Sequence, residues 1–172
     1  LVVLTGGTTV PGEGGAAQND TWHFDAMDMN WTMSAGNGTP PQRHQAAVTG
    51  FDGGLFSYGG IDASPSTADG LFLYDVATET WVAIDVPPPG ARSAAAAAFD
   101  ASGIVTLTGG VGLGKPSTLS DAYDFVLADS TISSLIEPGF GQVFNHEIVY
   151  LRPGFAVQFG GRDDSLNALS TT

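Results

Sequence analysis

A short apolar segment that ends in a pair of glycines occurs four times along the chain at nearly even spacing. The four copies are LVVLTGG, LFSYGG, IVTLTGG and AVQFGG, at 1–7, 55–60, 104–110 and 156–161. Their first glycines stand 53, 50 and 51 residues apart. Repeats of about 50 residues that are built on strands indicate a repetitive all-β architecture.

The first two repeats continue with an aromatic segment and a tryptophan, Trp31 and Trp81, and the third has Ile132 at this position. Alternating apolar and polar residues predict strands, and four antiparallel strands account for the length of one repeat. Because a single sheet leaves both of its faces open, neighbouring repeats must stack to bury them. We therefore expect the tryptophans to pack between sheets. We also expect the glycines to mark sharp turns or close backbone contacts.

A proline-rich loop and a small-residue strand complete each repeat. Arg43 and Arg92 occupy the same place at the start of this strand, and the alignment puts Asn145–His146 where Arg43–His44 stands. The alanines at 94–98 favour a helix by intrinsic propensity. The repeat order nevertheless predicts a strand, and small side chains suit the innermost strand of a radial arrangement.

The charge balance is strongly acidic, with a net charge of −13, one lysine and four arginines. Binding to a phosphate backbone or an anionic membrane surface needs clustered Lys and Arg, which the chain lacks. Nucleic acid is therefore not expected as a partner. No apolar run approaches the roughly 18–20 residues of a membrane span, so direct membrane insertion is not expected either. The absence of cysteine removes disulfides, thiolate nucleophiles and Cys-based zinc sites.

These motifs resemble the kelch repeat, in which a strand ends in Gly-Gly and is followed by an aromatic residue and then a tryptophan. The matches are Gly6-Gly7, Phe24 and Trp31; Gly59-Gly60, Tyr74 and Trp81; Gly109-Gly110, Phe125 and Ile132, with the tryptophan lost; and Gly160-Gly161. The resemblance implies a kelch-type β-propeller of four-stranded antiparallel blades, of the galactose oxidase and kelch superfamily.

At about 51 residues per repeat, the 172 residues correspond to about 3.4 blades, and propellers of this family usually close with about five to seven. The resemblance therefore implies a segment of a larger propeller whose remaining blades are its partners. A ring of two copies is the alternative. The expected units are a partial blade at 1–42, blades at 43–91 and 92–143, and a partial blade at 144–172.

Three of the five asparagines lie in Asn-X-Ser/Thr acceptor sites within nineteen residues, at Asn19, Asn30 and Asn37. This clustering favours N-glycosylation and a secreted or cell-surface protein. The alternative is that Asn19 forms a turn in the repeat, that the other two sites are accidental, and that the protein is cytoplasmic.

Long loops after the second and fourth strands of each repeat are expected at one end of the sheets. Binding usually uses the variable loops of a rigid scaffold, so we expect the ligand there. The candidate binding residues are Arg43, Arg92, Asp62 and Asp163. Structural roles are the alternative: contacts to loop carbonyls for the arginines, and a solvated turn for Asp163. Asp163 and Asp164 could also contribute to a cation site.

The sequence predicts a non-enzymatic binding or scaffold module that recognises a protein or carbohydrate ligand without a cofactor. His23, His44 and His146 lack metal-ligand spacing and are interpreted as structural, and no metal site is expected. No serine accompanies a histidine and aspartate in a recognisable elbow. One alternative is an intracellular kelch adaptor that scaffolds a protein complex. The other is a galactose-oxidase-like enzyme whose site lies in blades outside this chain.

Overall fold

The computed structural model describes residues 1–10, 15–36, 38, 40, 42–63, 68–87, 89–112, 118–135 and 141–169. Within these ranges every regular element is a β-strand, and the sheets of two to four strands are antiparallel. The expected all-β fold is therefore confirmed. The same ranges contain no helix long and apolar enough to cross a membrane.

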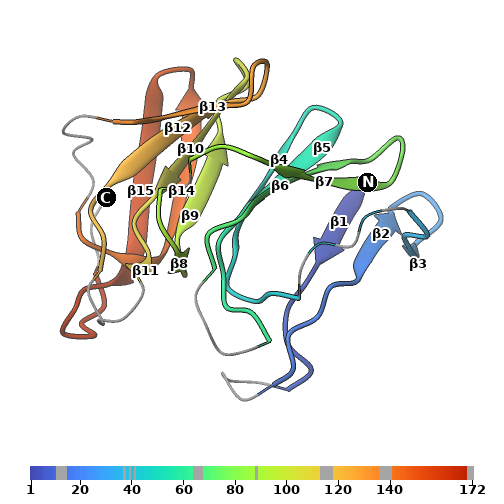
Figure 1. Cartoon of the computed structure of the whole chain (residues 1–172), viewed down its shortest axis with the longest axis horizontal. Helices are drawn as coiled ribbons and strands as arrows, with labels where there is room; N and C mark the ends of the chain where they lie inside the picture. Colours follow the sequence, from blue (N-terminus) through green and yellow to red (C-terminus); the bar gives the residue numbers. More distant parts are fainter. Residues whose placement is uncertain are drawn as a thin grey trace.

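The described residues form five sheets, of which the four larger ones are numbered I to IV along the chain and the fifth is a short pair of two-residue strands (Figure 1). Sheet I contains β1 (Val2–Thr5), β2 (Thr21–Asp25) and β3 (Asn30–Met33). Sheet II contains β4 (Ala47–Phe51), β5 (Gly54–Tyr58), β6 (Leu71–Asp75) and β7 (Thr80–Ile84). Sheet III contains β9 (Ala96–Phe99), β10 (Ile104–Thr108), β12 (Ala122–Val126) and β13 (Thr131–Ser134). Sheet IV is the hairpin of β14 (Phe144–Arg152) and β15 (Phe155–Arg162), and β8 (Arg92–Ser93) pairs with β11 (Val111–Gly112).

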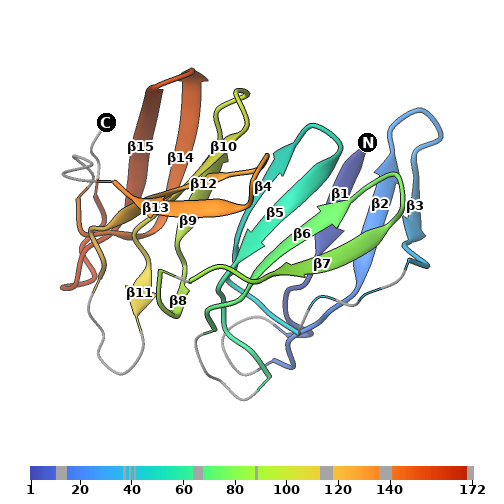
Figure 2. The same ribbon diagram turned by 45° about the horizontal axis from the view of Figure 1, so that its top comes forward.

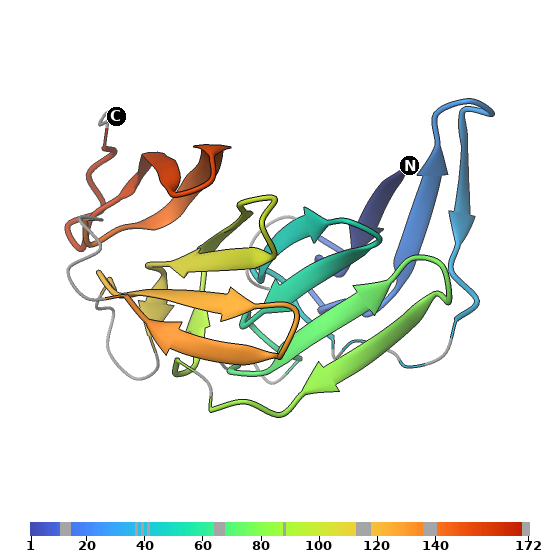
Figure 3. The same cartoon turned by 90° about the horizontal axis from the view of Figure 1, so that it is seen from above.

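The sheets follow one another in an open arc, with sheets I and IV at its two ends (Figures 2 and 3). The innermost strands of sheets II, III and IV meet in turn, because β9 contacts both β4 and β14. Strand β9 holds most of the alanine run, so the prediction of an innermost strand there is confirmed.

The largest apolar core lies between sheets II and III. Phe56 and Phe125 face each other across it with ring centroids 5.6 Å apart, and Tyr58, Val105 and Leu107 are buried beside them. Removing these side chains from water is the main favourable term in stacking the two sheets.

The layer between sheets III and IV is more polar. The Ala96 and Ala98 side chains pack against Ile148, and the Thr106 and Tyr150 hydroxyls lie 2.6 Å apart. Each interface therefore joins consecutive repeats, as the repeat pattern requires.

The tryptophans that share a position in the first two repeats, Trp31 and Trp81, differ in burial. Trp81 is 7% exposed and its indole N–H donates to the Thr21 hydroxyl of sheet I at 3.0 Å, so it packs between sheets as predicted. Trp31 is 45% exposed, and for this residue the prediction is wrong. Side chains alternate along β2, and His23 points towards Tyr74 of sheet II. Phe24 and its cross-strand partner Trp31 therefore lie on the outward face of sheet I.

The glycine pairs bring successive loops together. Gly59 has φ of 70°, and a Cβ atom placed on it would lie 2.3 Å from the Arg92 carbonyl oxygen. The next residue, Gly60, donates its N–H to that same carbonyl at 2.8 Å. Both predicted reasons for glycine, a left-handed backbone and a close approach, hold at this position.

The predicted alignment of the last repeat is off by two residues. The carbonyls that accept the N–H of Gly7, Gly60 and Gly110 belong to Arg43, Arg92 and Val143. Val143 therefore takes the arginine position, and Asn145–His146 stands two places later. A second ladder confirms this register, because Ala94 N–H donates to the Gln45 carbonyl and Asn145 N–H to the Ala94 carbonyl, both at 2.9 Å.

Candidate functional site

In the described part of the chain, the residues that begin and end the long connections lie at one end of the sheets, and the tight turns lie at the other (Figure 1). The long-loop face comprises the described residues of 6–20, 34–46, 59–70, 85–95, 109–121 and 161–169. Adjacent loops are joined through backbone bonds, such as Gly7 N–H to the Arg43 carbonyl at 2.9 Å. The strands thus hold the loops in fixed relative positions, which is the usual design of a binding surface.

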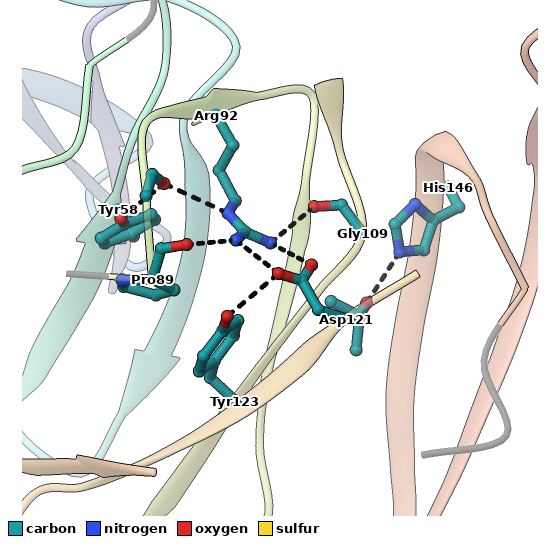
Figure 4. Close-up of polar contacts among 9 residues, drawn as sticks. Tyr58, Pro89, Arg92, Gly109, Asp121, Tyr123 and His146 are labelled. Carbon is teal, nitrogen blue, oxygen red and sulfur yellow. Dashed lines mark hydrogen bonds and ion pairs between the residues drawn. The ribbon is translucent and has the colours of Figure 1, made fainter. Parts of the chain in front are cut away.

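Arg92 is the centre of a polar cluster on this face (Figure 4). Its side chain is 1% exposed and all five of its N–H groups find acceptors. The Nη atoms donate to both Asp121 carboxylate oxygens at 2.7 and 2.9 Å, and to the Gly109 and Pro89 carbonyls at 3.1 and 2.8 Å. Nε donates to Gly90 at 3.4 Å. Arg92 therefore ties the loops at 85–95 and 109–121 together, and a ligand would have to displace one of these partners.

Two tyrosines complete the cluster. Tyr123 donates its hydroxyl to Asp121 at 3.0 Å and lies beneath the Arg92 guanidinium, and Tyr58 donates to the Gly90 carbonyl at 2.9 Å. Burial raises the pKa of Tyr123, with Asp121 adding to the shift, and burial also raises the pKa of Tyr58. Both hydroxyls therefore stay protonated donors.

Arg43 is the counterpart of Arg92 in sheet II. Its Nη1 donates to the Gly59 and Gly70 carbonyls at 2.8 and 3.1 Å, and the guanidinium lies 4.9 Å from the Phe72 ring centroid. Burial lowers the pKa of Arg43, while the charges of Asp69 and Asp62 oppose that shift. The Nε atom is buried without a hydrogen-bond partner among the described residues.

The two predicted aspartates occupy different loops. Asp62 is half-buried and close enough to Arg43 to influence it electrostatically. Asp163 accepts the N–H groups of Ser165 and Asn167, each at 2.9 Å, and these bonds hold a turn. The structure thus brings Asp62 near Arg43 and leaves Asp163 in the turn that follows β15.

Several carboxylates on the long-loop face are not singled out by the sequence, and Asp121, which orients Arg92, is one of them. Asp164, which the sequence offered for a cation site, accepts both the N–H and the hydroxyl of Thr118. The carboxylates of this face are Asp20, Asp62, Asp69, Asp85, Asp121, Asp163 and Asp164. A sequence signal for part of this set exists, because an aspartate stands two residues before an aromatic in both Asp20–Trp22 and Asp121–Tyr123. Arg43 and Arg92 are engaged internally and Arg162 is exposed, so carboxylates outnumber the free cations in the described part of this face and it presents mainly negative charge.

A cavity of about 260 Å³ opens between sheets I and II, with Trp81 and Glu79 in its wall. Glu79 accepts the Ser34 hydroxyl at 2.9 Å, and Ser34 in turn accepts the Tyr74 hydroxyl at 3.0 Å. His23 bonds to Tyr74 at 2.8 Å rather than to the serine. The arrangement joins two sheets and does not form the nucleophile–base pair that acyl-transfer chemistry requires.

The remaining predicted residues lie apart from one another. Asn19 is half-buried beside this cavity, and Asn30 is exposed at the opposite end of sheet I. Asn37 lies outside the described residues. In the part of the chain that the structure describes, no three His, Asp or Glu side chains are grouped so as to hold a metal ion.

No family model matches the chain, and no curated protein matches it.

Proposed function

We propose that the chain belongs to a kelch-type β-propeller and serves as a non-enzymatic binding module of a secreted or cell-surface protein. In this proposal the long-loop face recognises a protein or carbohydrate ligand. Two complete four-stranded meanders, flanked by three- and two-stranded sheets in matching register, support the blade assignment.

The charge of the long-loop face carries the proposal about the ligand. Arg92 and Arg43 donate to groups within the protein, whereas Asp69, Asp85 and Asp164 are exposed. A negative surface attracts positively charged partners and speeds their association. We therefore favour a basic protein segment over an acidic one.

Selection of peptides from a random library on the immobilised chain tests this proposal. Enriched peptides should be rich in Lys and Arg. They should lose at least tenfold in affinity for an Asp69→Asn, Asp85→Asn double variant. An Asp28→Asn, Asp52→Asn variant removes the same charge from exposed residues at the tight-turn end and should bind normally. Neutral or acidic peptides, or equal losses in both variants, would contradict a basic ligand.

The secretory part of the proposal has a separate test. The intact mass of the natural protein should fall when N-glycans are removed enzymatically, and peptide mapping should find the modification at the exposed Asn30. An unchanged mass would favour an intracellular adaptor.

A further inference from the structure

The guanidinium groups of Arg43 and Arg92 hold the same place in sheets II and III but differ in how completely they are bonded. All five N–H groups of Arg92 find acceptors. Arg43 donates only through Nη1, to the Gly59 and Gly70 carbonyls at 2.8 and 3.1 Å. In the described part of the chain no hydrogen bond or ion pair involves its Nε or Nη2, and Nε is buried. We call these two neighbouring donors the free edge of Arg43.

In sheet III the protein's own loop fills the corresponding edge. Nη2 of Arg92 donates to the Pro89 carbonyl at 2.8 Å, and Nε donates to the Gly90 carbonyl at 3.4 Å (Figure 4). Gly90 has φ of 97°, a left-handed backbone that turns the loop back onto the arginine. In sheet II a proline stands at this place, two residues before Arg43, and a proline ring holds φ at about −65°. The sequence therefore denies Arg43 the turn that satisfies Arg92.

The carboxylate that pairs with Arg92 also has no counterpart in sheet II. Gly109 N–H donates to the Asp121 carbonyl, and the equivalent Gly59 N–H donates to the Gly70 carbonyl. Gly70 thus stands at the place of Asp121 and carries no side chain. A turn and a carboxylate are both missing beside Arg43, and each is missing because of a residue type in this chain.

The strands around the two arginines are otherwise matched. None of the hydrogen bonds of Arg92 comes from β4, the innermost strand of sheet II. Beside Arg43, strands β1, β5 and β6 border a cavity of about 30 Å³ through Thr5, Ser57 and Phe72. This volume has room for one carbonyl oxygen or one water molecule. The free edge is therefore a property of sheets I and II themselves.

Asp69 and Asp62 limit the charge of a group that can enter. Their negative charges already act on the Arg43 guanidinium, against the effect of burial. A further anion would be repelled by both carboxylates. A neutral acceptor such as a backbone carbonyl satisfies the free edge without this repulsion, as the loop carbonyls do for Arg92.

We propose that the free edge of Arg43 binds backbone carbonyls of the basic peptide segment, in the way that Arg92 binds the carbonyls of Pro89 and Gly90. Lysine or arginine side chains of the same segment pair with the exposed Asp69, which directly precedes Gly70. This inference rests on the function proposed above, because it states how the same partner is held. The carboxylates select for positive charge and Arg43 selects for a main chain, because a guanidinium presents two donors side by side.

The test compares two probes of equal charge by isothermal titration calorimetry on the 172-residue chain. The peptide acetyl-Lys-Lys-Pro-Gly-Lys-Lys-amide has carbonyl groups, whereas spermine has none. Arg43→Lys keeps the positive charge but has no free edge. This variant should bind the peptide at least fivefold more weakly and spermine as the natural chain does. Arg162→Lys makes the same change at an exposed residue of the long-loop face and should alter neither affinity.

A measurement on the natural chain covers the case in which Arg43→Lys folds poorly. In NMR spectra, the Arg43 Nε–H signal should move downfield with the peptide and stay in place with spermine. Equal affinities of Arg43→Lys and the natural chain for the peptide, or an Nε–H signal that the peptide leaves in place, would overturn this inference. The preference for a basic ligand would then still stand if Asp69→Asn, Asp85→Asn weakens both probes. Failure of both probes to bind would overturn the basic ligand and this inference together.

Discussion

Arg92 shows how much a single side chain can fix in this fold. Its guanidinium is 1% exposed and bridges the segment at Pro89 and Gly90 to Gly109 and Asp121. Arg92 is buried and the Asp121 side chain is 35% exposed. Removing the arginine leaves Asp121 and the buried loop carbonyls without their donor, and breaking such a pair costs about 3–5 kcal/mol. The loops of sheets II and III therefore depend on one residue.

We expect Arg92→Ala to lower the free energy of unfolding by about 3–5 kcal/mol, measured by urea denaturation. Arg152→Ala serves as the matched control because Arg152 is exposed and lies over the Phe155 ring. That change should cost less than about 1 kcal/mol. Similar small losses in both variants would show that the cluster does not hold the loops.

His146 should make stability depend on pH. It is 4% exposed, its Nε2 lies 2.7 Å from the Thr108 hydroxyl, and its Nδ1 is buried without a partner in the described residues. Burial lowers the pKa of His146 to about 4. The pKa of histidine in the unfolded chain is near 6.5. Between pH 6.5 and about 4, His146 is therefore protonated in the unfolded chain and neutral in the folded chain.

The free energy of unfolding should accordingly fall by about 2–3 kcal/mol as the pH drops through this window. His146→Gln should remove that slope while keeping a group that can bond to Thr108. Both proteins should still lose stability below pH 4, because hydrogen bonds from Thr78 lower the pKa of Asp75 in the folded state. An unchanged slope between pH 6.5 and 4 in the variant would contradict the assignment.

At the scale of the strands, the glycine pair ends one strand and admits the loop of the next sheet. The backbone of Gly59 is left-handed and its Cα faces the Arg92 carbonyl, so Gly59→Ala should cost at least about 2 kcal/mol. Gly53→Ala is the control, because Gly53 has φ of 80° but no atom within 4 Å of an added Cβ. That change should lower the free energy of unfolding only by the cost of holding alanine in a left-handed backbone conformation, about 1 kcal/mol. If urea denaturation showed equal losses of unfolding free energy in the two variants, the close contact with the Arg92 carbonyl would not account for the glycine at position 59.

The strand order could be predicted from the sequence because it depends on local features. Glycine pairs, aromatic segments and the alanine run each mark one strand, and the repeat frame overrode the helix propensity of β9. The last repeat was misaligned because Val143, which takes the arginine position, carries no charge to mark it. The Arg92–Asp121 pair joins residues 29 positions apart through the path of two loops, and no local pattern encodes that path.

At the scale of the molecule, the arc has two unlike apolar ends. The outward face of sheet I exposes Val2, Leu4, Trp31 and Met33, and that of sheet IV exposes Val149, Leu151, Phe155 and Phe159. Within the arc, the same two kinds of face meet wherever one sheet packs on the next, as where Phe56 of sheet II contacts Phe125 of sheet III. The exposed face of sheet IV therefore has the character of a face that packs on the next sheet. The exposed face of sheet I has the character of a face that packs on the preceding one.

This complementarity predicts head-to-tail association of the 172-residue chain. An unlike pair of surfaces that does not close on itself generates a series of oligomers rather than a single dimer. Sedimentation equilibrium should show a mean mass that rises with concentration above 17.6 kDa. Phe159→Lys should raise the concentration needed for association at least tenfold, because association would bury the lysine charge. Val82→Lys adds the same charge at an exposed position of sheet II and should leave it unchanged. A monomer at all concentrations would mean that these faces do not recognise each other, and that the apolar ends require sheets of a different kind to cover them.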